Sequence, residues 1–386
     1  MRKWLQAIRQ STTYLGVAVI VIIWGGIYLL ASQEHESAYQ DAVRQGSNLA
    51  RVLEEYIRRV VQESDSALLE LRRDYQKDPQ HFDIAGWVAR TQTHTNLTVQ
   101  FGIADAHGFV KLSSLGPLPS PVYVGDRTPF KFSRDDTADQ LYISDPVIGR
   151  VTKKLTIEIT RRMNKPDGSF GGVVVSSLGV AQLEKFFTSL DLGRDGIVSL
   201  VGADGVVRAR GGPHQDARGF AGVSTIHSPL FSDVRHSLAG SYWNNAASRA
   251  HFDGVRRLIS YRTVSGIPLI AVVGLAEQDI FHQADATLRK YILAGSVLTA
   301  IVLIAMLFGA TQQANILATA AELQRSKQSL EQSNLLLHTA LKNMAHGLCM
   351  FDGAQRLVVC NERYGEMYGL APEQTEPGTT LQSILE

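Results

Sequence analysis

The side chains that could hold a metal ion or carry out catalysis form no recognised catalytic motif in this sequence. The eleven histidines include no H-E-x-x-H pair, and no G-x-S-x-G, Walker or kinase signature occurs. The carboxylate cluster at 134–139 (RDDTAD) could attract Ca²⁺, but it lacks a closing Glu and is more typical of a solvated turn. We therefore expect no metal and no cofactor in these residues, and the pattern leaves open whether the protein is an enzyme.

The composition narrows the class of protein. The 386 residues suit two or three domains, and a net charge of +1 with 45% hydrophobic residues favours neither nucleic-acid binding nor disorder. Two cysteines, Cys349 and Cys360, are too few for a disulfide framework. They are interpreted as small buried hydrophobic residues, and a haem ligand or photoreceptor thiol, with His346 nearby, is the alternative.

Two uncharged apolar stretches are long enough to cross a bilayer. Residues 14–31 (YLGVAVIVIIWGGIYLLA) and 291–311 (YILAGSVLTAIVLIAMLFGAT) each predict a membrane-spanning helix, because only a helix satisfies its own backbone in hydrocarbon. The first stretch could instead be a signal peptide, but its apolar run is long for one and no clean A-x-A site follows. The lipid bilayer is therefore an expected partner.

The charges beside these stretches predict an orientation. Arg2, Lys3 and Arg9 precede the first span with no acidic residue, so residues 1–13 are predicted to stay in the cytoplasm. Basic residues just before the second span weaken this prediction. Two spans would expose residues 32–290 on the outer side and return the chain to the cytoplasm, which is the layout of a receptor.

The exported segment begins with a helical pattern that no Gly or Pro interrupts from Ser47 until Pro79. Its apolar positions recur at three, four or seven residues: Ala42, Leu49, Leu53, Tyr56, Val60, Ala67 and Leu71. Strand pairs with turn residues between them follow, so the pattern predicts α+β modules. These pairs are predicted at 100–114, 154–178, 197–210 and 257–275.

Three of the strand–turn–strand patterns resemble one another. They lie at 100–114, 197–210 and 348–361, each with Asp and Gly at or near the turn. This similarity predicts three related modules, two outside the membrane and one inside.

A heptad follows the second span, at 312–340 and slightly beyond. One set of positions is mainly leucine, and the other set includes two polar residues. The sets are Leu323, Leu330, Leu337 and Met344, and Ala320, Lys327, Asn334 and Leu341. The pattern predicts a coiled coil in a parallel homodimer, and the alternative is a lone amphipathic linker helix.

The end of the chain resembles a known signalling module. The elements N-M-x-x-G-L-x-M-F-D, R-L-V-V-C-N and R-Y-x-x-M-Y-G-L within 340–370 resemble the N-terminal half of a PAS domain. PAS domains of this kind precede diguanylate cyclase and phosphodiesterase domains in bacterial receptors. About 44 residues follow Asn343, which is small for a stable domain, so residues 341–386 are expected to be the start of a PAS domain in a longer protein. Whether such a domain would bind a cofactor stays open.

The exported segment resembles a double Cache sensor, which has a long helix and two PAS-like modules, usually with the ligand in the membrane-distal one. The matching stretches are DRTPF at 126–130, LYISDP at 141–146, GSFGGVVV at 168–175 and DGVRRLISY at 253–261. The resemblance implies a two-span protein of the bacterial inner membrane, with residues 32–290 as a periplasmic sensor.

The resemblance also implies a ligand site. In amino-acid-binding relatives a Tyr, an Arg and aromatic residues hold the ligand carboxylate, and Asp residues hold the amine. The corresponding region here contains Tyr123, Asp126, Arg127, Phe130, Tyr142 and Asp145. The alternative is that Asp126 and Arg127 simply pair with each other to hold a loop.

One departure affects the identity of the ligand. Where those relatives have an Asp at the end of the Gly-Val-Val strand, this chain has Ser176, Ser177 and Leu178. A missing carboxylate removes one partner for an ammonium group, so an organic acid or another small metabolite is as well supported as an amino acid.

The sequence thus predicts a receptor that binds a small molecule outside the membrane and signals through the coiled coil and the PAS segment. The expected output is cyclic di-GMP synthesis or hydrolysis beyond residue 386, and a sensor histidine kinase with the same front end is the alternative. A ligand-binding scaffold protein without catalytic output is the alternative from another class.

Overall fold

The computed structural model describes residues 2–91, 97–213, 220–244 and 254–385, with side chains from Thr13 onward. Contacts divide the chain into two units. The sensor unit is Gly26–Leu293, and the other unit combines Met1–Gly25 with Ala294–Glu386.

A single long helix, α1 (Arg2–Lys77), forms one side of the sensor unit. Its apolar stripe is buried as the helical spacing predicts: Leu53, Leu68 and Leu71 are at most 1% exposed. Tyr56 stacks on Phe186 at 4.2 Å between ring centroids. The predicted helix is therefore confirmed, and it forms the support on which both sheets pack.

The first module follows α2 (Ile84–Thr91) and contains a five-stranded antiparallel sheet in the order β2-β1-β5-β4-β3. Its elements are β1 (Thr98–Asp105), β2 (Val110–Ser113), α3 (Thr128–Asp135), β3 (Tyr142–Ile148), β4 (Leu155–Asn164), β5 (Phe170–Gly179) and α4 (Val180–Thr188). The predicted strand pairs at 100–114 and 154–178 are both present as hydrogen-bonded neighbours.

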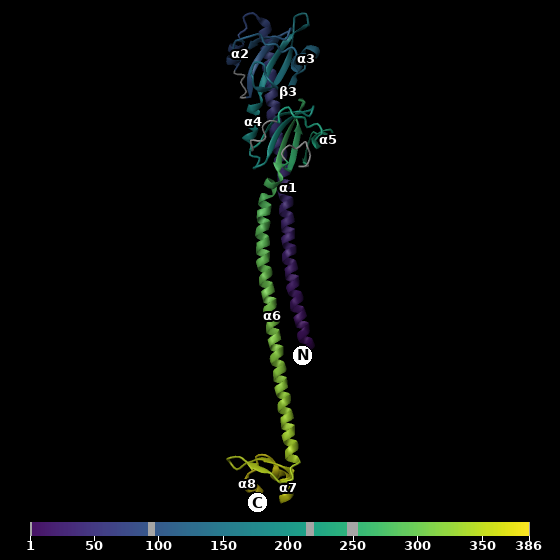
Figure 1. Ribbon diagram of the computed structural model, residues 1–386, viewed down its shortest axis with the longest axis vertical. Coiled ribbons are helices and arrows are strands. Elements are labelled where there is room, and N and C mark those ends of the chain that lie inside the picture. Colours follow the sequence, from purple (N-terminus) through teal and green to yellow (C-terminus); the bar gives the residue numbers. More distant parts are fainter. Residues whose placement is uncertain (1, 92–96, 214–219, 245–253, 386) are drawn as a thin grey trace. The chain divides into compact units, whose positions relative to one another are not determined.

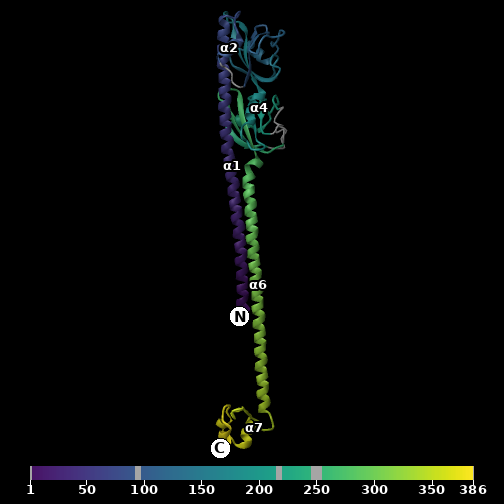
Figure 2. The ribbon, with the colours of Figure 1, turned by 90° about the vertical axis from the view of Figure 1, so that its left-hand side faces the viewer.

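The second module repeats this design in the order β7-β6-β10-β9-β8. Its elements are β6 (Ile197–Gly202), β7 (Val207–Gly211), α5 (Pro229–Val234), β8 (Ala239–Trp243), β9 (Arg257–Thr263) and β10 (Leu269–Ala276). The hairpin glycines Gly108 and Gly205 both have φ of +86°, which a turn with left-handed backbone requires. The two sheets follow one another along α1 (Figures 1 and 2).

The central strand β10 is buried on both faces. In β10, Leu269, Ala271, Val273 and Leu275 belong to the large core that includes α1. The alternate residues Ile270 and Val272 pack in a separate cluster with Leu230 and Phe231 of α5. This alternation explains why the central strands read as continuous apolar runs, since a strand covered on both faces needs no polar side.

The unit outside the sensor, formed by Met1–Gly25 and Ala294–Glu386, contains apolar helical stretches and a small α+β region. α6 (Glu277–Lys342) is one continuous helix that includes the predicted second span. α1 and α6 are each long and apolar enough to cross a membrane, and only 6% of either apolar window is buried. The region after α6 contains β11 (Cys349–Phe351) paired with β12 (Leu357–Cys360), then α7 (Glu362–Tyr368), η2 (Pro372–Thr375) and α8 (Leu381–Leu385).

Candidate ligand-binding site

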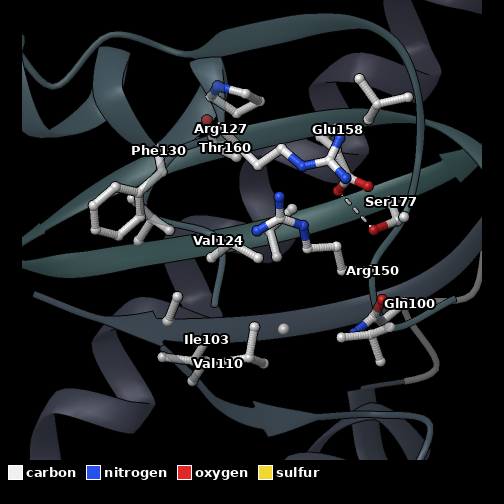
Figure 3. Close-up of a pocket in the computed structure, with 18 of the residues that line it drawn as sticks. Gln100, Ile103, Val110, Val124, Arg127, Phe130, Arg150, Glu158, Thr160 and Ser177 are labelled. Carbon is white, nitrogen blue, oxygen red and sulfur yellow. Dashed lines mark hydrogen bonds between the residues drawn. The ribbon is translucent and has the colours of Figure 1, made fainter. Parts of the chain in front are cut away.

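A cavity lies in the first module between the sheet and the segment that leads into α3. Its space, including the open solvent at its mouth, is about 680 Å³, and its walls come from all five strands of the sheet, from α3 and from the β3–β4 turn (Figure 3). The apolar walls include Ile103, Ala104, Val110, Val124, Phe130, Val147, Val173 and Val175. The polar lining comes from Gln100, Arg127, Arg150, Glu158, Thr160 and Ser177.

Arg127 reaches the cavity from the N-terminal cap of α3. Its backbone N–H donates to the Val124 carbonyl at 3.0 Å, which fixes the turn before the helix. Its guanidinium donates to the Ile148 carbonyl at 3.2 Å, and within the described part of the chain it makes no ion pair. A guanidinium has five N–H donors, so Arg127 keeps donors with which it can bind an anion in the cavity.

Arg150 lies in the turn between β3 and β4, and its guanidinium is hydrogen-bonded to other residues of the protein. It donates to both carboxylate oxygens of Asp126, at 2.7 and 2.6 Å, and also to the Tyr123 carbonyl. This hydrogen-bonded contact is the main reason that the pKa of Asp126 is lowered, and the Arg127 charge contributes less. The Asp126–Arg150 pair joins the two loops at the cavity mouth.

Glu158 carries the one carboxylate among the described residues that line the cavity, and this residue is half-buried. It lies on β4 directly opposite Ser177 of β5. The hydroxyls of Ser177 and Thr156 donate to its two oxygens at 2.7 and 2.8 Å. Desolvation is the largest influence on this group and raises its pKa, against the lowering effect of the two hydroxyls and of the Arg127 charge.

The close-up view shows how these charges are arranged. The Arg127 side chain extends along the sheet toward the Glu158 carboxylate, and the Arg150 guanidinium enters the same space (Figure 3). Phe130 closes the opposite end, with its ring edge-on to Phe170 at 5.4 Å. The cavity therefore offers a cationic side, a carboxyl group and apolar walls.

Two of the six residues predicted as ligand contacts line the cavity. These are Arg127 and Phe130. Asp126 and Tyr123 lie beside its mouth and contact Arg150. The alternative pairing of Asp126 with Arg127 is not the arrangement found, because Asp126 pairs with Arg150 instead.

The other two predicted residues, Tyr142 and Asp145, are on β3 and do not line the cavity. Tyr142 packs against Phe132 at 4.5 Å. The Asp145 carboxylate forms an ion pair with Arg208 of the second module, at 2.7 Å. Arg208 also pairs with Asp204, at 2.6 Å. The structure thus puts Asp145 at the junction between the two modules.

Three polar residues that line the cavity were not predicted from the sequence: Arg150, Glu158 and Gln100. For Glu158 a signal exists: it is the one charged residue at the centre of the run LTIEIT, where a strand buried on both faces would otherwise be apolar. For Arg150 no signal exists in the sequence, because its contact with Asp126 joins residues 24 apart across two loops.

The carboxylates at 134–139 are used by neighbouring groups. Asp135 pairs with Arg134, Asp136 accepts backbone N–H groups, and Asp139 pairs with Arg72 at 2.8 Å. Across the residues that the structure describes, no cluster of three His, Cys, Asp or Glu side chains could hold a metal ion.

Comparisons with known proteins agree with this fold. A family profile described as a histidine kinase sensor domain matches residues 180–274, and one described as a PAS fold matches residues 341–386. The extracellular domain of rpHK1S-Z16, described as a histidine kinase, aligns with a TM-score of 0.54 at 24% identity, over 62% of this chain and 95% of that domain.

Two ligand-binding domains of known structure align less closely. That of the Pseudomonas fluorescens chemoreceptor CtaA with L-alanine has a TM-score of 0.45 at 18% identity, covering 62% of this chain and 96% of that one. That of Mlp24 with asparagine has a TM-score of 0.45 at 17% identity, covering 66% and 99%. No curated protein sequence matches the chain.

The alignment with the extracellular domain of rpHK1S-Z16 shows that the sensor unit shares its fold. Gly26–Leu293 has the fold of a double Cache sensor, and the last 46 residues, 341–386, match the start of a PAS fold. The chain thus combines a sensor unit with the Cache fold, a segment that matches a PAS fold, and two helices long and apolar enough to cross a membrane.

Proposed function

We propose that this receptor binds a small zwitterion of the α-amino-acid type in the cavity of the first module. The observation that carries this proposal is the presence of two charged groups of opposite sign, Arg127 and Glu158, in one apolar cavity. Neither makes an ion pair within the described residues, and a ligand with both charges would satisfy each of them.

The chemistry of the two groups supports the orientation of such a ligand. The planar guanidinium of Arg127 can donate two parallel hydrogen bonds to a carboxylate. The Glu158 carboxylate, already held by the Ser177 and Thr156 hydroxyls, can accept a hydrogen bond from an ammonium group. The valine and isoleucine walls leave room for an aliphatic side chain, and Phe130 would border it.

Glu158 also supplies a carboxylate that the sequence comparison suggested was missing, namely the Asp that the amino-acid-binding relatives have at the end of the Gly-Val-Val strand. The strand end that carries an Asp in the amino-acid-binding relatives has Ser177 here, and Ser177 donates to Glu158 on the neighbouring strand. A carboxylate is therefore present one strand away from the expected place, which supports a ligand with an amine.

An organic acid is the second candidate, and one specific observation favours it. Because burial raises the pKa of Glu158, its protonated form persists to a higher pH than for an ordinary Glu. A protonated carboxyl could donate a hydrogen bond to a second acidic group of the ligand, whereas the ionised form would repel it.

The two candidates are separated by calorimetric titration of the full chain in lipid nanodiscs with three probes of similar shape: leucine, 4-methylpentanoate and 3-methylbutylamine. Binding of leucine alone supports the zwitterion. Binding of 4-methylpentanoate as tightly as leucine identifies an acid site. No heat and no thermal stabilisation with any probe or with a wider set of amino and organic acids would contradict a ligand site here.

The signal is proposed to leave the sensor through α6 toward the PAS segment. Leu323, Leu330 and Leu337 of the heptad are 73%, 63% and 57% exposed in the single chain, which supports their pairing with a second copy in a parallel dimer. Replacing Leu330 by a charged residue would then abolish a ligand-dependent response. In a scaffold protein without output, the same substitution would leave signalling unchanged.

The output is proposed to be cyclic di-GMP synthesis or hydrolysis, in a continuation of the chain on the cytoplasmic side. The resemblance of the PAS segment to those that precede such enzymes supports this. The match of residues 180–274 to a histidine kinase sensor domain favours a kinase as the alternative. Sequencing the reading frame past Glu386 decides between a GG[DE]EF segment and a histidine-bearing helix pair with an ATP-binding domain.

A further inference from the structure

The two cysteines of the chain lie directly opposite each other in the C-terminal hairpin. Cys349 on β11 is the register partner of Cys360 on β12 in the antiparallel pair. Both are free thiols and both are half-buried. Directly opposed residues of an antiparallel pair project to the same face of the sheet, so the two thiols share one side of the hairpin.

The hydrogen bonds identify which kind of pair this is. The Asn361 backbone N–H donates to the Leu348 carbonyl at 3.0 Å, so the Leu348–Asn361 pair is a hydrogen-bonded one. Pairs alternate along an antiparallel ladder, and the next pair, Cys349–Cys360, is therefore non-hydrogen-bonded. Cα atoms in such pairs are about 4.5 Å apart, at the short end of the range that a disulfide can bridge.

We propose that Cys349 and Cys360 form a redox-active dithiol that a peroxide closes into an intramolecular disulfide. One thiolate attacks the peroxide and becomes a sulfenic acid, with release of one water or alcohol. The second thiolate attacks that sulfur, forms the S–S bond and releases a second water. Two thiols lose two electrons and two protons, and the peroxide O–O bond is reduced.

The environment of the pair predicts how the oxidation depends on pH. Burial, and next the charge of the nearby Cys360, raise the pKa of Cys349 to about 11. The thiolate is the attacking form, so the oxidation rate should rise steadily from neutral pH toward this value. A dithiol reductant would reopen the bond by thiol–disulfide exchange.

The next residue gives the disulfide a structural consequence. Asn361 is buried and joins the end of α6 to the hairpin. Its side-chain amide donates to the Leu341 and His346 carbonyls at 3.2 and 3.0 Å, and its side-chain oxygen accepts from the Leu348 N–H at 2.8 Å. A covalent bond at the adjacent position would restrict the movement of this junction.

The test uses the reduced full chain in nanodiscs, exposed to hydrogen peroxide and followed by intact mass and maleimide labelling. The expected result is the loss of two hydrogen atoms and of both labelling sites, reversed by dithiothreitol. The matched control combines Cys360→Ser with Val359→Cys, which moves one thiol to the other face of the hairpin. It should form an intramolecular disulfide at least about tenfold more slowly, because opposed thiols have a high effective concentration.

The second readout is hydrogen exchange at the Leu348 and Asn361 amides, which should slow on oxidation of the natural chain and stay unchanged in Cys360→Ser. Formation of only intermolecular links, sulfinic acid without a disulfide, or equal rates in the natural chain and the control would overturn the dithiol. A disulfide that leaves exchange at both amides unchanged would overturn its link to the α6 junction.

Discussion

The two modules of the sensor have the same topology, but the sheet face that borders a cavity in the first is packed in the second, within the residues that the structure describes. In each, one sheet face packs on the core shared with α1, and the other face is covered by a short helix. In the second module this covered face is filled by Tyr261, Phe231 and their neighbours. In the first, the same face borders the cavity that Arg127 and Glu158 line. Corresponding positions of the two modules carry different residues.

Strand register identifies those positions. β5 and β10 are each followed directly by a helix, so their residues can be matched by counting back from the end of each strand. By this count, Ser177 of β5 corresponds to Gly274 of β10. Their partners on the neighbouring strands are Glu158 and Ile259. Two residues further along, Thr160 of β4 corresponds to Tyr261 of β9 in the same way.

The helix caps correspond as well. Arg127 caps α3 and donates its backbone N–H to the Val124 carbonyl, and Ser228 caps α5 and donates likewise to the Thr225 carbonyl. The difference teaches that one backbone can either border a candidate ligand cavity or form a packed support, depending on the side chains at the cap and on the central strands. Exchanging the corresponding residues tests this statement directly.

The largest effect is expected from Arg127→Ser, which copies the cap of the second module. Serine is a better N-cap than arginine, so the fold should be retained. Loss of a charge that pairs with the ligand in a desolvated cavity should weaken binding by about 2–5 kcal/mol. Calorimetric titration with the probe that binds the natural protein measures the change.

Lys131→Gln serves as the control for Arg127→Ser, because it removes an exposed positive charge from α3 outside the cavity lining. Its affinity should match that of the natural protein. If both variants bind the probe equally well, the cavity is not where the carboxylate is held.

A reciprocal exchange of Thr160 and Tyr261 should have the next largest effect. Tyr261→Thr empties volume in the packed cluster and should cost about 2–4 kcal/mol of unfolding free energy, in line with other large-to-small core changes. Thr160→Tyr adds a ring at the wall of an open cavity and not inside a packed cluster, so it should change stability less while it blocks the ligand. Chemical denaturation and titration of both variants provide the measurements. Equal destabilisation by the two exchanges would contradict the contrast between a cavity in the first module and a packed face in the second.

Much of the fold was predictable because it depends on local pattern. The long helix follows from apolar spacing, and the strand pairs follow from turn residues and alternating burial, so all five predicted hairpins are present. The sensor resemblance identified the region that contains Arg127 and Phe130.

The rest of the site could not be predicted, because it depends on contacts between distant segments. The resemblance to amino-acid-binding relatives placed Asp145 in the ligand region, and in the structure it lies on β3 and pairs with Arg208 of the second module. Glu158 enters the site through cross-strand register with Ser177, and register is a property of the assembled sheet. The local sequence specifies neither the register between paired strands nor which neighbour an edge strand contacts.

The smallest expected effect, and the one that distinguishes the two ligand candidates, is the pH dependence due to Glu158. Its folded-state pKa is raised above the ordinary value of 4.5, so the unfolded chain loses this proton first as pH rises. The contribution of Glu158 to stability is therefore full below the ordinary value and is lost as pH rises through the raised one. Glu158→Gln, which keeps a hydrogen-bonding side chain, should remove this dependence from thermal unfolding curves. The second module has Ile259 at this position and contributes no such titration.

Ligand affinity should follow the same ionisation with a sign that depends on the ligand. An amine-bearing ligand needs the ionised carboxylate, so leucine should bind more tightly as pH rises through the raised pKa of Glu158. A purely acidic ligand is repelled by that charge and should bind less tightly over the same interval. In Glu158→Gln either trend should flatten, with leucine weakened and 4-methylpentanoate unaffected or strengthened. Parallel pH profiles for the natural protein and Glu158→Gln would mean that the Glu158 carboxyl group takes no part in binding, and the cavity would then differ from the packed face of the second module in volume and cationic charge alone.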